Sequence, residues 1–378
     1  MIEERDINEI RNKDFLKNKD HFRDFDDVET DLLFGRISKD KLFLSIIVPV
    51  YDHPIELILR AINSVLYQKC DYSYQILILD DNANSKRNDV LLEYIQKLND
   101  PRFVYFKNRR NLGVFGNWNR GIELANSQWV TILHTDDFFK NNLLTTYKAI
   151  IDGHPEIDQL CCNYKMLQIK DKNLNIDKEY HCQKSHTMVR KVRYTEYFYE
   201  MKTSVKGSFY KKDKLVELGG FRSQGDGLGL DDYPLMLRYA YYYNTYLIED
   251  VLYLDSWGYN DSLNTKHWFP ELIANYYMML YFAGKEKGIK RRVYERNAFY
   301  LLRNRAIDYD KGTSWVGIPV PIDFELLQDC CGVDFSSYNI IEEKLISFFA
   351  RMFNFLYKHP LKKFNVTIDE GTSLNTLR

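Results

Sequence analysis

The chain has 378 residues, which is long enough for one large domain or two modest ones with a sizeable buried core. Hydrophobic residues make up 45% of the sequence and aromatic residues 15%, a composition that excludes an intrinsically disordered chain. The 52 Lys and Arg residues balance the 53 Asp and Glu residues, so the formal net charge is −1 and we expect no nucleic-acid partner.

Residues 1–40 are charged throughout and are interpreted as a polar N-terminal extension with a helix over residues 7–22. This segment lacks the apolar core of a signal peptide, and no apolar run in the chain approaches the roughly 18 residues of a membrane-spanning helix. The six cysteines show neither zinc-binding nor disulfide spacing. Together these features predict a cytoplasmic protein with reduced thiols.

Residues 41–264 show the alternation of strands and helices that is typical of an α/β domain. Apolar, β-branched runs predict buried strands over residues 42–51, 74–81, 102–107 and 128–134. Helical spacing between these runs predicts helices over residues 54–68, 89–98 and 113–127. Such alternation implies right-handed crossovers and a doubly wound, Rossmann-like, mostly parallel sheet.

The sequence beyond this core is less regular. Residues 161–193 are rich in Lys and Asn and are interpreted as a hairpin with loops, and residues 245–250 predict one more strand. Residues 265–378 predict a helical, aromatic-rich C-terminal region. Within it, residues 341–364 predict a basic amphipathic helix whose apolar stripe fits core packing, a homodimer contact or peripheral contact with a membrane.

Three of the predicted strands end in polar residues. Tyr51 and Asp52 follow the first strand, Asp80 and Asp81 end the second, and residues 134–137 end the fourth. Ligands of open α/β sheets bind beyond the carboxyl ends of the strands, so these residues predict a binding site at one rim of the sheet. A solvated turn or a helix cap is the alternative interpretation of each acidic pair.

Several nucleotide-binding devices are missing from this rim. The loop after the first strand contains no glycine, which excludes the G-x-G-x-x-G fingerprint, and the chain has no Walker A loop. The glycine-rich loop of sugar-phosphate nucleotidyltransferases is also absent. A bound diphosphate would therefore be neutralised by a divalent cation, and the adjacent carboxylates of Asp136 and Asp137 suit that cation.

Four segments in order resemble the motifs of glycosyltransferase family 2: "SIIVPVY", "ILILDDN", "NLGVFGNWNRGIELANSQWVTILHTDD" and "GLDDYPLMLR". The resemblance covers residues 42–264. It implies a GT-A fold, a nucleotide-sugar donor and, in general, inversion at the transferred sugar. The residues that the resemblance assigns to donor binding are Pro49, Tyr51, Asp80, Asp81, Asn111 and Asn119.

The resemblance also implies a metal site, although the chain departs from the family pattern there. Asp136 occupies the metal-binding position of the family, while His134 stands where the first acid is expected and is a second candidate ligand for Mn²⁺ or Mg²⁺. Trp118 stands where the family has an arginine near the nucleotide. Arg109, Arg110 and Arg120 are the candidates to replace it.

The fourth motif implies the catalytic base. Asp232 takes the position of the basic aspartate, with Asp231 in place of the glutamate before it, and an acceptor hydroxyl needs such a group to receive its proton. A helix start with acids in its first turn is compatible with the same residues. A later loop resembles the family's closing loop over the diphosphate and acceptor, and implies roles for Trp257, Asn260 and Asp261.

The resemblance therefore implies an inverting hexosyl- or N-acetylhexosaminyltransferase. By the resemblance, it would use a UDP-sugar and a glycan or lipid-linked acceptor in bacterial surface polysaccharide synthesis, in the cytoplasm or at the inner face of the membrane. Two rival hypotheses remain open. One is a non-catalytic nucleotide- or glycan-binding relative, and the other is a sugar-phosphate nucleotidyltransferase.

Overall fold

The computed structural model describes residues 19–83, 88–168, 186–199, 203–222, 232–257, 267–314, 317–355 and the backbone of 362–365. The strands are β1 (Thr30–Phe34), β2 (Leu42–Val50), β3 (Tyr74–Asp80), β4 (Phe103–Asn108), β5 (Ser127–Ile132), β6 (Phe138–Phe139), β7 (Gln159–Gln168), β8 (His186–Val192), β9 (Phe209–Lys211), β10 (Thr245–Trp257) and β11 (Lys362–Asn365). The α-helices are α2 (Ile55–Leu66), α3 (Asp89–Leu98), α4 (Gly113–Leu124), α5 (Leu143–Gly153), α7 (Lys212–Glu217), α8 (Asp232–Tyr242), α9 (Trp268–Ala283), α10 (Gly288–Asp310), α11 (Phe324–Cys331) and α12 (Ile340–Phe355). Short 3₁₀ turns are η2 (His21–Phe25), η3 (Tyr194–Phe198) and η7 (Phe335–Ser337).

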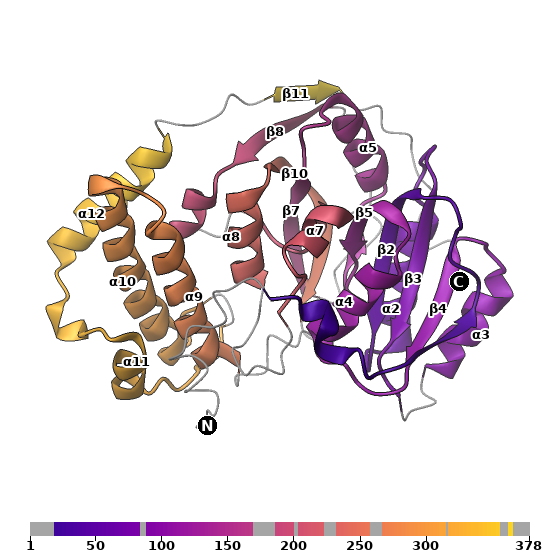
Figure 1. The fold of residues 1–378 in the computed structure, drawn as a ribbon, viewed down its shortest axis with the longest axis horizontal. Coiled ribbons are helices and arrows are strands. Elements are labelled where there is room, and N and C mark those ends of the chain that lie inside the picture. The colour runs from indigo at the N-terminus through magenta and orange to yellow at the C-terminus, as the bar shows by residue number, and fades with distance from the viewer. Residues whose placement is uncertain are drawn as a thin grey trace.

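A single sheet runs through the molecule in the order β1-β4-β3-β2-β5-β9-β7-β10-β8-β11, with β6 paired to β10 (Figure 1). The four strands β4, β3, β2 and β5 are parallel to one another, as the sequence predicts. β3 is buried along its whole length, because helices cover both faces of this part of the sheet. The α/β, doubly wound prediction is confirmed.

The two faces of the sheet carry separate hydrophobic cores. One core joins Ile46 and Ile78 to side chains of α2, α3 and α5. The other joins Ile47 and Leu79 to α4, α8 and α9. Consecutive strand residues point to opposite faces, so the apolar runs of β2 and β3 serve both cores at once.

The N-terminal segment joins the sheet. β1 pairs antiparallel with β4 at the edge, and Phe22 of η2 is buried against the core. Arg120 of α4 donates hydrogen bonds to the backbone oxygens of Phe25 and Val28. Residues 21–34 of the predicted polar extension thus pack onto the sheet, whereas most of the predicted helix over residues 7–22 lies outside the described residues.

The hairpin expected over residues 161–193 is wrong. β7 and β8 do not pair, because β10 lies between them, parallel to β7 and antiparallel to β8. β10 is 13 residues long and pairs with β6 as well. β7 and β8 each pair instead with β10, which follows them by more than fifty residues in the chain.

Helices α9 to α12 make up most of the described residues between 268 and 355, but the helix predicted over residues 341–364 is wrong at its end, because α12 is described only to Phe355 and residues 362–365 form strand β11. α9 packs on α10, α10 packs on α12, and the hydroxyl of Tyr277 donates to the backbone oxygen of Cys330 in α11. Figure 1 shows α9 to α12 gathered beyond α8, on the side of the sheet away from β1. The five cysteines within the described residues are free thiols, and no helix there is long and apolar enough to span a bilayer.

Candidate active site

A cavity of about 890 Å³ opens at the carboxyl ends of the parallel strands, where the sequence predicts the site. One half is built by the ends of β2, β3 and β5 and the start of α4. The other half is built by α8, α9, α10 and the segment after α10. Lining residues include Pro49, Tyr51, Asp81, Asn111, Trp118, His134, Asp136, Lys206, Asp232, Asp255, Trp268, Glu271, Asn275, Arg305, Asp308 and Ser314.

Asp81 fixes the junction between β3 and α4. Its carboxylate accepts hydrogen bonds from the backbone N–H of Leu112 at 2.9 Å and from the side-chain amide of Asn108 at 2.8 Å. Its own N–H donates to the backbone oxygen of Val50, which ties the ends of β3 and β2 together. Burial raises the pKa of Asp81 to about 6.

Two of the residues assigned to donor binding do not line the cavity. Asp80 is buried and accepts hydrogen bonds from Asn88 at 2.8 Å and Tyr105 at 3.2 Å. Asn119 exchanges two hydrogen bonds with the backbone of Phe221. Both side chains are hydrogen-bonded within the protein. They therefore stabilise the loops next to the cavity and are not exposed to a ligand in it.

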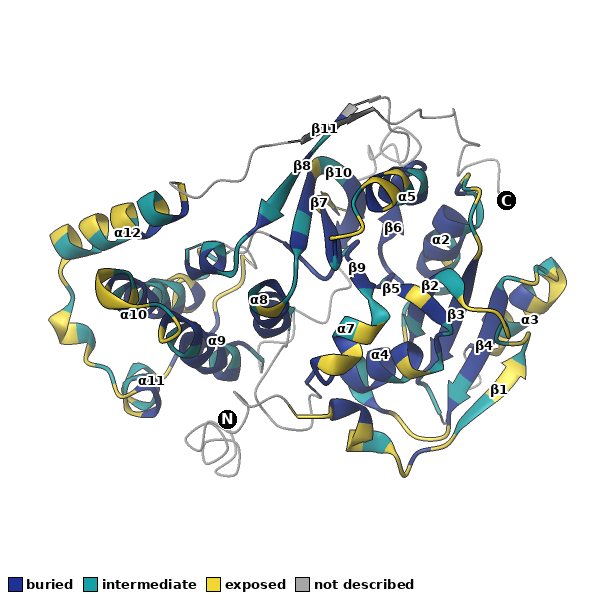
Figure 2. Ribbon diagram, turned by 45° about the horizontal axis from the view of Figure 1, so that its top comes forward, coloured by how far each residue is buried: buried dark blue, intermediate teal, exposed yellow. Residues whose placement is uncertain are grey.

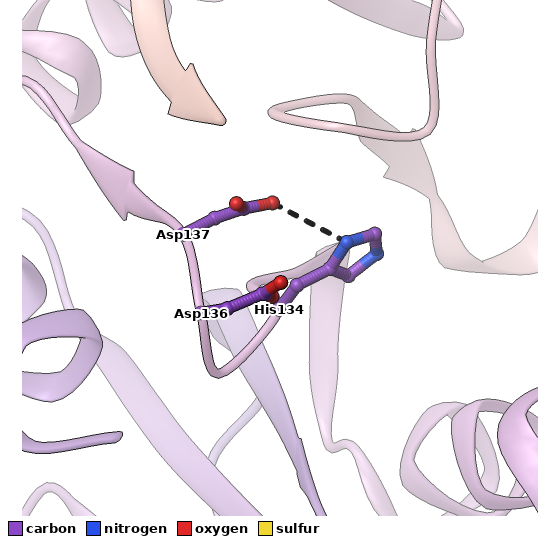
Figure 3. A group of neighbouring side chains, drawn as sticks. All are labelled: His134, Asp136 and Asp137. Atoms are coloured by element: carbon purple, nitrogen blue, oxygen red, sulfur yellow. Dashed lines mark ion pairs between the residues drawn. The ribbon is translucent and has the colours of Figure 1, made fainter. Parts of the chain in front are cut away.

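A cluster of three side chains follows β5. Ligand atoms of His134, Asp136 and Asp137 all lie within 4.8 Å of one another, and the imidazole of His134 points toward Asp137 (Figure 3). The distance from His134 Nδ1 to Asp137 Oδ2 is 3.4 Å. Arg60 holds the loop in place by donating to the backbone oxygen of Asp136 and to Ser256 Oγ, both at 3.0 Å.

The two adjacent carboxylates have different surroundings. Asp137 is fully buried and accepts hydrogen bonds from the N–H of Ser256 at 2.7 Å and the hydroxyl of Tyr253 at 2.8 Å. Burial opposes its ionisation, but His134 and Lys206 hold its pKa below the ordinary value. Asp136 lines the cavity, and burial together with the charge of Asp137 raises its pKa to about 7.

The two residues that depart from the family pattern, Trp118 and His134, are in contact. The indole of Trp118 stacks on the imidazole of His134, with ring centroids 5.1 Å apart and planes 26° apart. His134 Nε2 is buried and has no hydrogen-bond partner among the described residues. The stack fixes the orientation of the imidazole, while Nε2 keeps its lone pair or proton available for a ligand.

The cavity also contains a cation that sequence reasoning missed. Lys206 Nζ lies 2.6 Å from Asp255 Oδ2, and the charges of Asp137 and Asp255 outweigh burial and raise the pKa of Lys206. Neither residue belongs to a recognisable motif, so only the fold reveals them. The arginine candidates do not line the cavity, because Arg109 and Arg110 pair with surface acids and Arg120 binds the N-terminal backbone.

Asp232 lines the cavity as the first residue of α8. It faces a wall that the sequence did not predict, formed by Trp268, Glu271 and Asn275 of α9 and Arg305 of α10. The side-chain amide of Asn275 donates to Glu271 Oε1 at 3.2 Å. Burial, followed by the nearby charge of Asp232, raises the pKa of Glu271 to about 7.

The predicted closing loop is only partly described. Trp257 is the last residue of β10, is half-buried and packs against the core, and it is not part of the cavity lining. Asp231, Asn260 and Asp261 lie outside the described residues.

Comparison with known proteins agrees with this architecture. Residues 45–199 match the model of the family described as glycosyl transferase family 2. An uncharacterized glycosyltransferase of Methanocaldococcus jannaschii is 28% identical over 178 residues, which are 47% of this chain and 58% of that protein. The Campylobacter jejuni GalNAc(5)-diNAcBac-PP-undecaprenol beta-1,3-glucosyltransferase is 30% identical over 140 residues, which are 36% of this chain and 41% of that protein.

A crystal structure of S. aureus TarS in complex with UDP-GlcNAc superposes with a TM-score of 0.50 at 17% identity, covering 71% of this chain and 73% of that chain. The curated relatives are matched over only part of their length, whereas the structural likeness extends over most of both chains and shows a common fold. Residues 45–199 therefore match glycosyltransferase family 2, and the sheet and helices of the chain form a GT-A fold.

Proposed function

We propose that the protein is an inverting glycosyltransferase that moves a hexose or N-acetylhexosamine from a UDP-sugar to a hydroxyl of a glycan or lipid-linked acceptor. The observation that carries this proposal is that Asp136 after β5 and Asp232 at the start of α8 line the same cavity. A nucleoside diphosphate held at the first residue and an acceptor hydroxyl held at the second would meet in that cavity.

The rim made by β2, β3 and α4 suits the nucleoside. Tyr51 is 53% exposed beside the cavity, so its ring is free to pack against a base. The carboxylate of Asp81 lines the same half and accepts hydrogen bonds, as a base N–H or a ribose hydroxyl would require. Asn111 at the start of α4 adds a second polar side chain.

The cluster after β5 fits a divalent cation. The Asp136 carboxylate and His134 Nε2 are available as ligand atoms, whereas both oxygens of Asp137 are already engaged. A mixed nitrogen and oxygen donor set suits Mn²⁺ better than Mg²⁺. When bound there, the cation supplies positive charge that stabilises a diphosphate leaving group.

Asp232 is the proposed general base. Its carboxylate accepts the proton of the acceptor hydroxyl while that oxygen forms a bond to the anomeric carbon, and the bond from this carbon to the diphosphate breaks. Attack and departure on opposite faces invert the configuration at that carbon. Lys206 adds a positive charge to the same cavity and offsets part of the negative charge that the diphosphate carries away.

The wall made by α9 and α10 suits a glycan acceptor. Glu271 Oε2 and Asn275 Oδ1 are buried and have no hydrogen-bond partner among the described residues, so sugar hydroxyls can satisfy them. The name of the C. jejuni relative specifies an undecaprenol-linked saccharide. It supports a role in a bacterial surface polysaccharide that is assembled at the cytoplasmic face of the membrane.

The first test measures thermal unfolding with UDP, with and without Mn²⁺, for the wild type and for Asp136→Ala. Saturation at about 100 times Kd adds roughly 2.7 kcal/mol to the stability, which is a shift of a few degrees. We expect a Mn²⁺-dependent shift that Asp136→Ala abolishes. Asp213→Asn, an exposed acid on α7, is the control and should keep the shift.

Turnover is then tested with a panel of UDP-sugars. Asp232→Asn should keep the UDP shift and lower the rate of UDP release by on the order of a hundredfold or more, because only the base is removed. Release of pyrophosphate in place of UDP would identify a nucleotidyltransferase. Binding of UDP without turnover of any UDP-sugar would identify a non-catalytic relative.

A further inference from the structure

The outer face of α12 is apolar and exposed. Figure 2 places this helix at the outer edge of the molecule beside α10. The exposed fractions are 69% for Ile341, 53% for Leu345, 60% for Phe348 and 66% for Phe355. These residues recur at helical spacing, so they form one continuous stripe, which we call the α12 face. The sequence alone left core packing open for this helix, and the exposed fractions exclude it for these four side chains.

The acidic residues of α12 are turned toward the protein. Glu342 pairs with Arg296 of α10 at 2.8 Å. Glu343 accepts hydrogen bonds from Asn304 of α10 at 2.7 Å and from the hydroxyl of Tyr338 at 2.8 Å. These bonds, together with buried Ala350 on the inner side, fix the rotation of the helix. Both carboxylates of α12 are therefore engaged by groups of the protein, although the Glu342 side chain keeps an exposed fraction of 43%.

Two cations border the α12 face. Lys344 and Arg351 are exposed, lie seven residues apart and so project along the same edge of the stripe. They make no ion pair with any part of the chain that the structure describes. An apolar stripe with a basic border, beside which the nearest acid, Glu342, is already paired with Arg296, matches the two layers of an anionic lipid surface, with acyl chains below and negative headgroups above.

We propose that the α12 face docks onto a membrane surface that contains anionic lipids. Ile341, Leu345, Phe348 and Phe355 enter the headgroup region, and Lys344 and Arg351 contact the lipid phosphates. A second copy of the chain is a poorer occupant, because two such faces would bring their basic borders together while the carboxylates of Glu342 and Glu343 are already engaged within each chain. The proposal concerns docking alone and does not depend on the reaction proposed above.

The test is cosedimentation of the full-length protein with sucrose-loaded vesicles of phosphatidylcholine, with and without 30% phosphatidylglycerol. The wild type should bind the anionic vesicles, and Leu345→Asp/Phe348→Asp should lower the partition coefficient tenfold or more. Lys344→Gln and Arg351→Gln should each lower it about fivefold, the equivalent of about 1 kcal/mol per charge. Val90→Asp, an equally exposed apolar residue on α3, is the matched control.

The proposal is overturned if the wild type stays in the supernatant with anionic vesicles, or if Val90→Asp loses binding as much as the double variant. Equal binding to neutral vesicles would remove the role of the two cations and overturn the charge argument. A dimer in vesicle-free gel filtration, dissociated by Leu345→Asp/Phe348→Asp while vesicle binding is absent, would assign the face to a second copy. Circular dichroism of each variant confirms that α12 and the core remain folded.

Discussion

Trp118 and His134 stand where the family resemblance leads one to expect an arginine and an aspartate, and their rings are stacked. The cavity therefore has two aromatic rings where the resemblance implies a positive and a negative side chain. The stack keeps the imidazole nitrogens of His134 close to Asp136 and Asp137. The three residues therefore still form a group that could hold a metal ion, with one nitrogen donor that is softer than a carboxylate. No arginine takes the place of Trp118 in the cavity lining near α4, and Lys206 brings a positive charge into the cavity from another part of the fold.

The first residue-scale prediction concerns this donor set. His134→Asp replaces a nitrogen ligand by the carboxylate that Mg²⁺ prefers, so the preference of UDP binding for Mn²⁺ over Mg²⁺ should shrink, on the order of tenfold. Isothermal titration of UDP with each metal measures it. An unchanged ratio of the two affinities would show that His134 does not contribute to the metal site.

The second residue-scale prediction uses Glu271, whose folded-state pKa of about 7 lies above its ordinary value. Between about pH 4.5 and 7 the folded protein keeps a proton that the unfolded chain has lost, so stability falls as pH rises through this window. Glutamine does not titrate, so Glu271→Gln removes this pH-dependent loss of stability. Relative to this variant, the wild type should lose on the order of 2 kcal/mol of unfolding free energy between pH 4.5 and pH 8.

Urea unfolding of the wild type and Glu271→Gln at both pH values gives this difference. Glu93→Gln, an exposed glutamate of α3, reports the pH effect of removing a surface carboxylate. If the wild type and Glu271→Gln differ by the same amount at both pH values, the buried carboxyl of Glu271 is not the cause.

At the scale of elements, α4 packs against β2 with Gly121 in close contact with the side chain of Ile47. A Cβ added at Gly121 would lie 2.5 Å from Ile47 Cγ2, and Ile47 is fully buried in the centre of the sheet. Trp118 of the same helix lines the cavity, and so does Asn111, which lies just before the helix begins. A shift of α4 would therefore disturb the core and the site together.

Gly121→Ala should lower the unfolding free energy by about 1–3 kcal/mol through overpacking, despite the better helix propensity of alanine. Gly153→Ala, at the end of α5, is the matched control, because an added Cβ there meets nothing within 4 Å. Chemical denaturation of both variants measures the two effects. If the unfolding free energy falls by a similar amount in both variants, close contact between α4 and β2 is not the reason that position 121 requires glycine.

At the scale of the whole molecule, the sequence predicted the centre of the fold well because local signals determine it. The apolar runs of β2, β3 and β5 and the helices between them need only periodicity and chain order. The choice between Asp80 and Asp81 was beyond the sequence, since neighbouring residues at a strand end point to opposite faces. Only the packed structure shows that Asp81 lines the cavity while Asp80 points at Tyr105.

The long-range features escaped prediction for a related reason. Nothing within residues 161–193 reveals that β10 separates β7 from β8. Glu271, Asn275 and Arg305 are single polar residues on long helices with no motif around them, and they meet Asp232 only through the packing of α9 and α10 beside α8. Lys206 is another isolated residue that the fold alone places beside Asp255.

The cavity has walls from two parts of the chain, and only one of them lies within the stretch that matches the family. In the proposed reaction the strand-end wall holds the nucleotide, while the helical wall of α9 and α10 belongs to a separate run of sequence. Natural selection could therefore rewrite the acceptor side by exchanging the helical segment while leaving the donor side intact. For protein engineers the same division marks a crossover point near the end of β10, where chimeras could recombine one donor specificity with many acceptors.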